Sequence, residues 1–305
     1  MPLAEISLED YAVLERGNSE RVVSSNGVHW RAIRPGFYQP LALFAEYPPG
    51  STRGPASSWF GGWQHAVPPG MKSNSSLKLI GFQDVKSYSI DTIVPARKRQ
   101  KMRSVIKGAQ KRYEVREIAT AAQFAEEAHP VYLDFQQRTG YVCMTDRLTP
   151  EGFAAWAERL FSPGKICAMG AYSESRLHAV TVWYLIQGTL VFASMFSSSE
   201  SQRHGVSDLL LHHARLTAAE HPDVHSIFAT RFRSGEGLDQ FYLHRGAVVI
   251  SKPAWLQINW AADQLLRVFK PEARQALWGA EPAAVVEEGA SPEAGSRLGS
   301  QDEAA

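Results

Sequence analysis

The sequence predicts an α+β protein in which helices flank a central mixed sheet that is mostly antiparallel. Segments with helical and strand-like periodicity alternate from Tyr113 onward. Three of the strands follow one another directly, with tight turns at 173–175 and 187–188, and this pattern is typical of an antiparallel meander. With 305 residues, 44% of them hydrophobic, the chain is long enough to bury a substantial core.

The first part of the chain, residues 1–94, differs in composition from the rest. From His29 to Phe82 it is rich in Pro, Gly and Trp, so we expect an irregular β-rich segment with strands at 41–47 and 76–82. The aromatic residues Trp59, Phe60 and Trp63 are interpreted as packing of a small sheet. A loop that lines a substrate is the alternative.

A basic stretch follows this segment. Between Pro95 and Tyr113 the chain holds eight basic residues and no acid. Four apolar residues recur at helical spacing and form one stripe: Met102, Val105, Ile106 and Ala109. An unfolded basic tail buries no apolar face, so it does not require such a stripe. We therefore predict a docked amphipathic helix over 95–112, whose charged faces meet solvent or bind phosphate; a nuclear or nucleic-acid signal is the remaining alternative.

The alternating part of the chain shows clear start and stop signals. Thr120 and Thr149 are expected to cap two helices, with Pro150 in the first position of the second helix, and Gly140 ends the first. The expected order is a strand at 113–118, helices at 120–140 and 149–161, strands at 165–173, 176–188 and 189–197, a helix at 205–221, a strand at 224–232, a helix at 237–246 and a strand at 247–259. A last helix is expected at 261–278.

The charge is unevenly distributed. The formal net charge is +1, and residues 281–305 contain six acids and one base, a net of −5, so the remainder carries about +6. A mildly basic body suits a polyanionic ligand such as a nucleotide cofactor. We expect three parts in the chain: an irregular N-terminal segment at 1–94, a domain with the leading basic helix at 95–280, and a disordered acidic tail at 281–305.

The compartment is predicted from cysteine usage and from the apolar runs. Cys143 and Cys167 make no CxxC motif, so we interpret both as buried free thiols of a reducing compartment. The N-terminus has acids where a signal peptide needs a basic segment, and no apolar run approaches the roughly 18 residues of a membrane span. We expect a cytoplasmic protein without a membrane span.

Two local motifs carry chemistry. The stretch "ESQRHGVSDLLLHHA" places Gln202, Gly205 and Ser207 at the start of a helix that follows the third meander strand. A helix N-terminus offers unpaired backbone N–H groups to a diphosphate, and glycine lets the backbone come close. Arg203 and His204 can add donors. The alternative is that these residues form an ordinary N-terminal turn of a helix and bind no ligand.

The second motif is "LDQFYLHRGAVV", in which Tyr242 stands four residues before Gly246. A phenol with a pKa near 10 is protonated at neutral pH and can donate to a thiolate. Packing between helix and sheet is the structural alternative for this tyrosine.

The element order and both motifs resemble the GNAT superfamily of acyl-CoA-dependent N-acyltransferases, over about 113–260. The resemblance implies a GNAT-like sheet, acetyl-CoA or another acyl-CoA as donor, no metal, and direct attack by the amine of a small-molecule or peptide acceptor. It implies that Gln202, Arg203, His204, Gly205, Val206 and Ser207 hold the diphosphate, and that Tyr242 is the acid. It also implies that the third meander strand pairs with pantetheine through Ala193, Ser194, Met195 and Phe196.

Other roles are less specific. Glu200, Glu236 and His178 are candidates for relaying the amine proton, and Arg231 and Arg233 could hold an anionic substrate group or form surface salt bridges. The spacing of the histidines does not favour a metal site, and no G-x-S-x-G, G-x-G-x-x-G or Walker motif occurs.

The basic helix followed by "VYLDFQQRTGY" is similar to the Fem-type branch, which includes aminoacyl transferases. Fem-type enzymes have two GNAT-like units, and this sequence indicates one complete unit, with 1–94 as an acceptor-side subdomain. Transfer from aminoacyl-tRNA is therefore an alternative, as is a catalytically silent binding or regulatory protein. Binding of tRNA would weaken when basic residues of the helix are neutralised.

Overall fold

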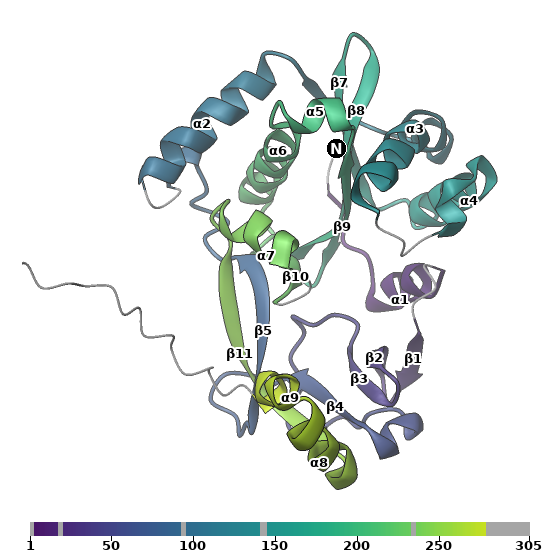
Figure 1. The fold of residues 1–305 in the computed structure, drawn as a ribbon, viewed down its shortest axis with the longest axis vertical. Helices are drawn as coiled ribbons and strands as arrows, with labels where there is room; N and C mark the ends of the chain where they lie inside the picture. Colours follow the sequence, from purple (N-terminus) through teal and green to yellow (C-terminus); the bar gives the residue numbers. More distant parts are fainter. Residues whose placement is uncertain (1–2, 18–20, 93–95, 141–144, 233–235, 279–305) are drawn as a thin grey trace, which may run out of the picture.

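One sheet runs through the molecule from end to end. The computed structural model describes residues 3–17, 21–92, 96–140, 145–232 and 236–278. Within these residues the sheet has 11 strands in the order β1-β2-β3-β4-β11-β5-β10-β9-β8-β7-β6. Most neighbours are antiparallel, and β3–β4 and β9–β10 are parallel. The predicted α+β class with a mixed, mostly antiparallel sheet is confirmed (Figure 1).

The alternating elements occupy the upper half and the middle of the molecule, and the last of them extends into the lower half (Figure 1). They are β6 (Glu114–Glu117), α3 (Ala121–Thr139), η3 (Thr145–Leu148), α4 (Pro150–Phe161), β7 (Cys167–Ser173), β8 (Arg176–Ile186), β9 (Thr189–Ser197), α5 (Ser199–Gln202), α6 (Val206–Glu220), β10 (Ser226–Arg231), α7 (Glu236–Leu243) and β11 (Val248–Ile258). This is the expected order, with β7, β8 and β9 as the meander.

Capping residues fix the two helices α3 and α4 as the sequence predicts. The Thr120 hydroxyl accepts a hydrogen bond from the Gln123 amide, and the Thr149 hydroxyl accepts one from the Gly152 amide. Gly140 ends α3 in the left-handed region with φ 62°. Pro130 is accommodated inside α3.

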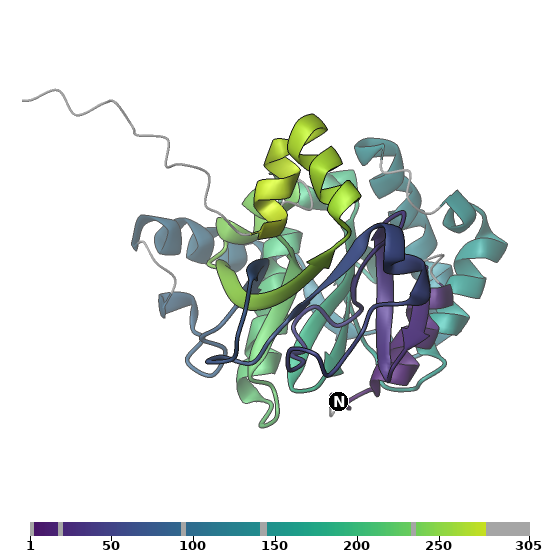
Figure 2. The same ribbon diagram turned by 90° about the horizontal axis from the view of Figure 1, so that it is seen from below.

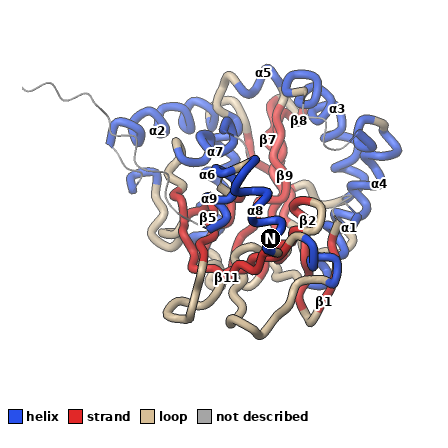
Figure 3. The backbone as a smooth tube through the Cα atoms, turned by 60° about the horizontal axis from the view of Figure 1, so that its bottom comes forward, coloured by secondary structure: helices blue, strands red, loops and turns tan. Residues whose placement is uncertain are grey.

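Helices cover both faces of the meander. On one face α6 and α2 (Ala96–Gln110) contribute to one core, and on the other α3, α4 and α1 (Leu8–Gly17) contribute to a second (Figure 1). Figure 3 shows the helices gathered around the β7–β9 end of the sheet, whereas the β1–β4 end carries more loops.

The N-terminal part extends the same sheet. It contributes β1 (Val22–Ser25), β2 (Val28–Arg34), β3 (Phe37–Pro40), η1 (Ala56–Phe60), β4 (Gly62–Ala66), β5 (Ser75–Phe82) and η2 (Ile90–Thr92). Because β5 lies between β10 and β11, the sheet continues across the boundary expected at residue 94. The C-terminal helices α8 (Trp260–Phe269) and α9 (Pro271–Trp278) stand together beside β11 (Figure 2).

Two expected elements are wrong in detail. Residues 41–47 form turns with one bridge, Glu46 to Ala66, instead of a strand, because Pro40 ends β3 and Pro48 follows closely. The single helix expected at 261–278 is two helices, since Pro271 cannot continue the hydrogen bonding of α8. The tail at 281–305 and Cys143 lie outside the described residues; Cys167 is a free, half-buried thiol.

The basic helix α2 docks on α6 through its apolar stripe, as predicted. Ile106 and Ala109 are buried, and Met102 packs on the same core. Gly205, the N-cap of α6, lies against this stripe with φ 73°, and a Cβ atom there would lie 2.3 Å from Cγ1 of Val105. Gly205 is thus required both by its backbone angle and by the approach of α2.

We expect Gly205→Ala to lower the free energy of unfolding by about 2–4 kcal/mol, because left-handed strain adds to overlap with Val105. Gly140→Ala is the matched control. Gly140 also has a positive φ, but a Cβ there would meet nothing within 4 Å, so a loss of only about 1 kcal/mol is expected. Equal losses in urea unfolding would show that α2 does not press on Gly205.

Candidate functional site

The parallel ladder between β9 and β10 is short. Residues Thr189–Val191 pair with Ser226–Phe228, and no further pair joins the two strands within the described residues. Just beyond, Ala193 is skipped in the pairing of β9 with β8, and Ala229 is skipped in the pairing of β10 with β5. Such bulges bend strands, so β9 and β10 separate at this level.

The separation leaves one edge of β9 without a neighbouring strand. The four residues expected to pair with a bound carrier lie here: Ala193, Ser194, Met195 and Phe196. Ala193 is exposed, whereas Phe196 is buried and packs on Tyr132 and Phe135 of α3. The backbone groups of this edge can pair with a further extended chain.

Tyr242 lies where the two strands part. Its ring centroid is 6.1 Å from that of Phe192, the first residue of β9 beyond the paired ladder. The residue is 5% exposed, and burial raises the pKa of Tyr242 to about 12. The phenol is therefore protonated at neutral pH, with a proton available to a ligand.

The N-terminus of α6 follows the open edge of β9 through the short helix α5. Gln202 and Arg203 are exposed, His204 and Ser207 are half-buried, and Gly205 and Val206 are buried. Within the described residues, the amides of Val206, Ser207 and Asp208 have no hydrogen-bond acceptor. These are the orphan donors that make a helix N-terminus attractive to an anion.

One acid stands in this first turn, and its charge is compensated. Asp208 accepts two hydrogen bonds from Arg245, from Nε at 2.6 Å and from Nη2 at 3.1 Å. Arg245 also donates to the carbonyl of Phe241 in α7. This bidentate pair joins α6 to α7 and leaves the positive end of α6 uncancelled. Arg245 is not among the residues predicted from the sequence, because nothing local pairs it with an acid 37 residues earlier.

Glu200, His178 and Tyr113 gather near the end of β9. Burial lowers the pKa of His178, and the carboxylate of Glu200 acts in the opposite direction. Burial raises the pKa of Tyr113, and Glu200 adds to this effect. The rings of Tyr113 and His178 are 5.4 Å apart. Glu200 is exposed, and the buried His178 is neutral at neutral pH, so the pair can take up a proton.

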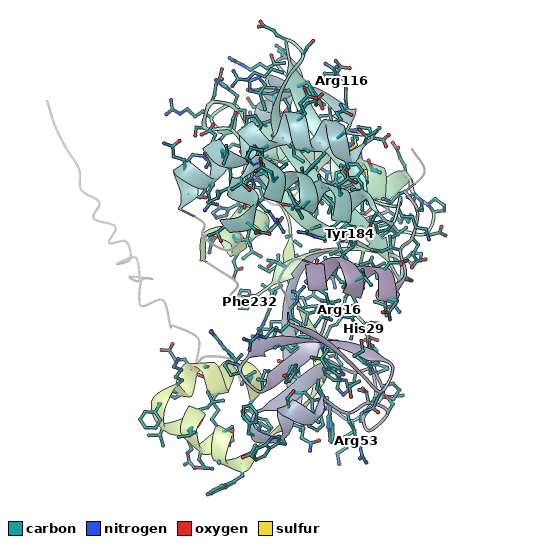
Figure 4. The ribbon with its side chains drawn as sticks, turned by 90° about the vertical axis from the view of Figure 1, so that its right-hand side faces the viewer. Arg16, His29, Arg53, Arg116, Tyr184 and Phe232 are labelled. Atoms are coloured by element: carbon teal, nitrogen blue, oxygen red, sulfur yellow. The ribbon has the colours of Figure 1, made fainter. Side chains whose placement is uncertain are left out.

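One of the remaining predicted residues lies on the other strand, β10. Arg231 is the last residue of β10. Burial lowers the pKa of Arg231, and the positive charge of Arg34 lowers it further. The two guanidinium groups therefore lie near each other. Glu236 begins α7, but its side chain and all of Arg233 lie outside the described residues. Figure 4 shows Phe232, which directly follows Arg231, between the upper and lower halves.

A cavity of about 350 Å³ borders the start of β10. Phe44, Leu79, Phe228 and Ile250 form its apolar lining, and Lys252 lies at the same cavity. Lys252 donates to the Phe44 carbonyl and to Glu46. Phe228 is the last residue of β10 paired with β9, so the cavity adjoins the point where the strands part.

Within the described residues, no group of three or more His, Cys, Asp or Glu side chains is arranged to hold a metal ion. In the same residues no helix combines the length and the apolar character needed to cross a bilayer.

Known proteins resemble this chain in sequence and in fold. Residues 96–228 match the family model described as an acetyltransferase (GNAT) domain. No curated protein matches the sequence. The fold is similar to the C-terminal domain of a protein assigned as a lysylphosphatidylglycerol synthetase from Agrobacterium fabrum, with a TM-score of 0.54, 12% identity, and coverage of 88% of this chain and 93% of that one.

FemX is a second solved structure with a similar fold. Its TM-score is 0.54 at 9% identity, with coverage of 86% of this chain and 93% of FemX. At these identities the likeness concerns the fold. It extends over both halves of the molecule, beyond the residues that match the family model.

The Asp208–Arg245 pair provides a test of how α6 is held. Both side chains are largely buried, so Asp208→Asn leaves Arg245 without its counter-charge, and we expect a loss of about 3 kcal/mol in the free energy of unfolding. Glu114→Gln is the control, because its pair with Arg116 is exposed and should change stability by less than about 1 kcal/mol. Urea denaturation of both variants measures the difference. An Asp208→Asn variant with an unchanged free energy of unfolding would contradict the role of the ion pair in holding α6.

Proposed function

We propose that this chain, a GNAT-superfamily protein with a Fem-like fold, is an N-acyltransferase that transfers an acyl group from acyl-CoA to an amine. The GNAT domain supports an acyltransferase-type enzyme in general terms. The observation that carries the finer proposal is the three-residue ladder between β9 and β10, with Tyr242 at the point where the strands part.

The residues present fit an extended carrier that ends in a diphosphate. The free edge at Ala193–Phe196 would pair with the pantetheine amides, and the unpaired amides of Val206 and Ser207 would face the phosphate oxygens. Gln202 and Arg203 are exposed beside this helix end and would add donors.

The reaction forms a bond between the acceptor nitrogen and the thioester carbonyl carbon, and the carbon–sulfur bond breaks. The acceptor nitrogen loses a proton, and the departing sulfur gains one. Tyr242 Oη would supply the proton to sulfur, because the phenol is protonated at neutral pH and lies where the two strands part. The Glu200–His178 pair, or Glu236, would take up the proton from nitrogen.

The acceptor is proposed to come from the side of residues 1–94. Phe44, Leu79 and Gln83 of that segment line the cavity at the start of β10, together with residues of β10 and β11. Half of the residues that line this cavity are apolar and half are polar or charged, a mixture that suits an amine with an apolar body. Arg231, half-buried at the end of β10, would contact an anionic group of the acceptor.

The proposal is tested by acyl-CoA turnover with a panel of primary amines. We expect Tyr242→Phe to lower kcat about 100-fold while acyl-CoA still binds, because the substitution removes one proton donor and keeps the ring. Tyr38→Phe is the control: Tyr38 is buried in β3 and bonds Ser57, far along the sheet from β9, so its kcat should stay within about twofold.

Native mass spectrometry of protein purified without added ligand gives an independent readout. A retained CoA species agrees with the proposal. If Tyr242→Phe turns over as fast as the wild type at every pH, the acid is wrong. If CoA binds but no amine is acylated, the chain is a silent GNAT-like binding protein.

A second candidate is transfer from aminoacyl-tRNA. It is favoured by the exposed lysines of α2 and the residues just after it, beside the N-terminus of α6: Lys101, Lys107 and Lys111. Several exposed cations near a helix N-terminus can contact a phosphate backbone.

The lysine variants distinguish the two donors. If tRNA is the donor, replacing Lys101, Lys107 and Lys111 together with Gln should weaken tRNA binding by at least about tenfold at low salt and flatten its salt dependence. If acyl-CoA is the donor, tRNA binding should be weak and unselective. Lys72→Gln, an exposed lysine in the lower half, is the control for a general loss of charge.

A further inference from the structure

The helix α8 presents its apolar side to solvent. No residue of α8 is buried. Two neighbouring rows run along its outer side, Trp260–Gln264–Val268 and Ala261–Leu265–Phe269. The exposed fractions are 76% for Trp260, 60% for Leu265, 69% for Val268 and 75% for Phe269. An amphipathic helix on a globular domain normally turns this side inward.

Polar contacts hold α8 in this orientation. Asp263, on the inner side, accepts hydrogen bonds from Nε and Nη2 of Arg274 and from Nε1 of Trp278, both in α9. At the start of α8 the Asn259 side chain accepts from the Ala261 amide. The outward position of the apolar rows is thus built into the contacts between α8 and α9.

Two further aromatic residues adjoin the start of α8. The Asn259 amide donates to the Gly61 carbonyl at 2.9 Å, and its side chain donates to the Trp59 carbonyl at 3.0 Å. Trp59 is 75% exposed and stacks edge-on with Phe60, which is 45% exposed. We name these six residues the α8 face: Trp59, Phe60, Trp260, Leu265, Val268 and Phe269.

The α8 face is the most apolar exposed part of the described surface. Its members include every large hydrophobic side chain that is at least 60% exposed within the described residues. The face lies at the outer end of the lower half, away from β9 and α6 (Figures 1 and 4). It is therefore separate from the gap between β9 and β10.

Basic side chains border this face. Arg267 and Lys270 are exposed at the end of α8. Glu272 is the exposed acid of α9. Each lysine or arginine near an anionic membrane surface contributes about 1 kcal/mol of attraction.

We propose that the α8 face docks into the headgroup layer of an anionic lipid bilayer. Trp and Phe beside basic residues, on a helix whose apolar side no other described residue covers, form the pattern of an interfacial helix. A second copy of the chain fits less well, because a symmetric pair would bring Arg267 and Lys270 near their own counterparts. A helix of ten residues is also only about 15 Å long, short for the roughly 800 Å² per partner of a standard interface.

Flotation of the full chain with vesicles tests the proposal. We expect binding to phosphatidylcholine vesicles that contain about one third phosphatidylglycerol, with a blue shift of tryptophan emission, and weaker binding to phosphatidylcholine alone. Leu265→Ser with Phe269→Ser should lower partitioning at least about tenfold. Arg267→Gln with Lys270→Gln should reduce binding to the anionic vesicles and its salt dependence.

The matched control is Val13→Ser with Leu216→Ser, which removes two exposed apolar side chains from α1 and α6. It should leave vesicle binding unchanged. Absence of wild-type binding would overturn the proposal, as would equal binding by the Leu265 and Phe269 double variant. The proposal would also be overturned if the wild type does not bind vesicles and is a dimer in sedimentation equilibrium, and if the Leu265 and Phe269 double variant is a monomer. Thermal unfolding of each variant verifies that it is folded.

Discussion

Hydrogen bonding between β9 and β10 ends at the pair Val191 and Phe228. The arrangement of the candidate site in the centre of the molecule depends on this early end of the ladder. Both strands bulge at the same level, β9 at Ala193 and β10 at Ala229, so neither could resume the ladder without a change of register. Backbone N–H and C=O groups need partners. An interior edge left open in the middle of a sheet is therefore a place where another extended molecule can complete the pairing.

The electrostatics around this edge depend on α6. Its first turn contains an acid, Asp208, which by itself would disfavour an anion, and Arg245 from the end of α7 neutralises it. The docked helix α2 brings further cations to the same end of α6 and fixes Gly205 by contact with Val105. The N-terminus of α6 is thus in contact with both the Asp208–Arg245 ion pair and the basic helix α2, although these residues are distant in sequence.

Local signals explain which features the sequence predicts. The caps Thr120 and Thr149, the stripe of α2 and the turns of the meander each act within a few residues, and each is found where expected. Features that depend on distant partners were missed: the bonding of Arg245 to Asp208, and β5 between β10 and β11. The strand expected at 41–47 failed because Leu41 and Leu43 are buried as loop residues, and apolar spacing alone does not separate that case from a strand.

The position of β5 also bears on how the chain reaches its native state. Both of its neighbours, β10 and β11, are synthesised long after Phe82, so β5 leaves the ribosome with two unpaired edges and a strongly apolar sequence. Contacts of such sequence separation slow folding, because loop closure precedes any gain in pairing. During synthesis the segment from Ser75 to Phe82 is thus exposed to aggregation, and we expect that a chaperone that shields it until Ile258 has emerged would raise the yield of folded protein.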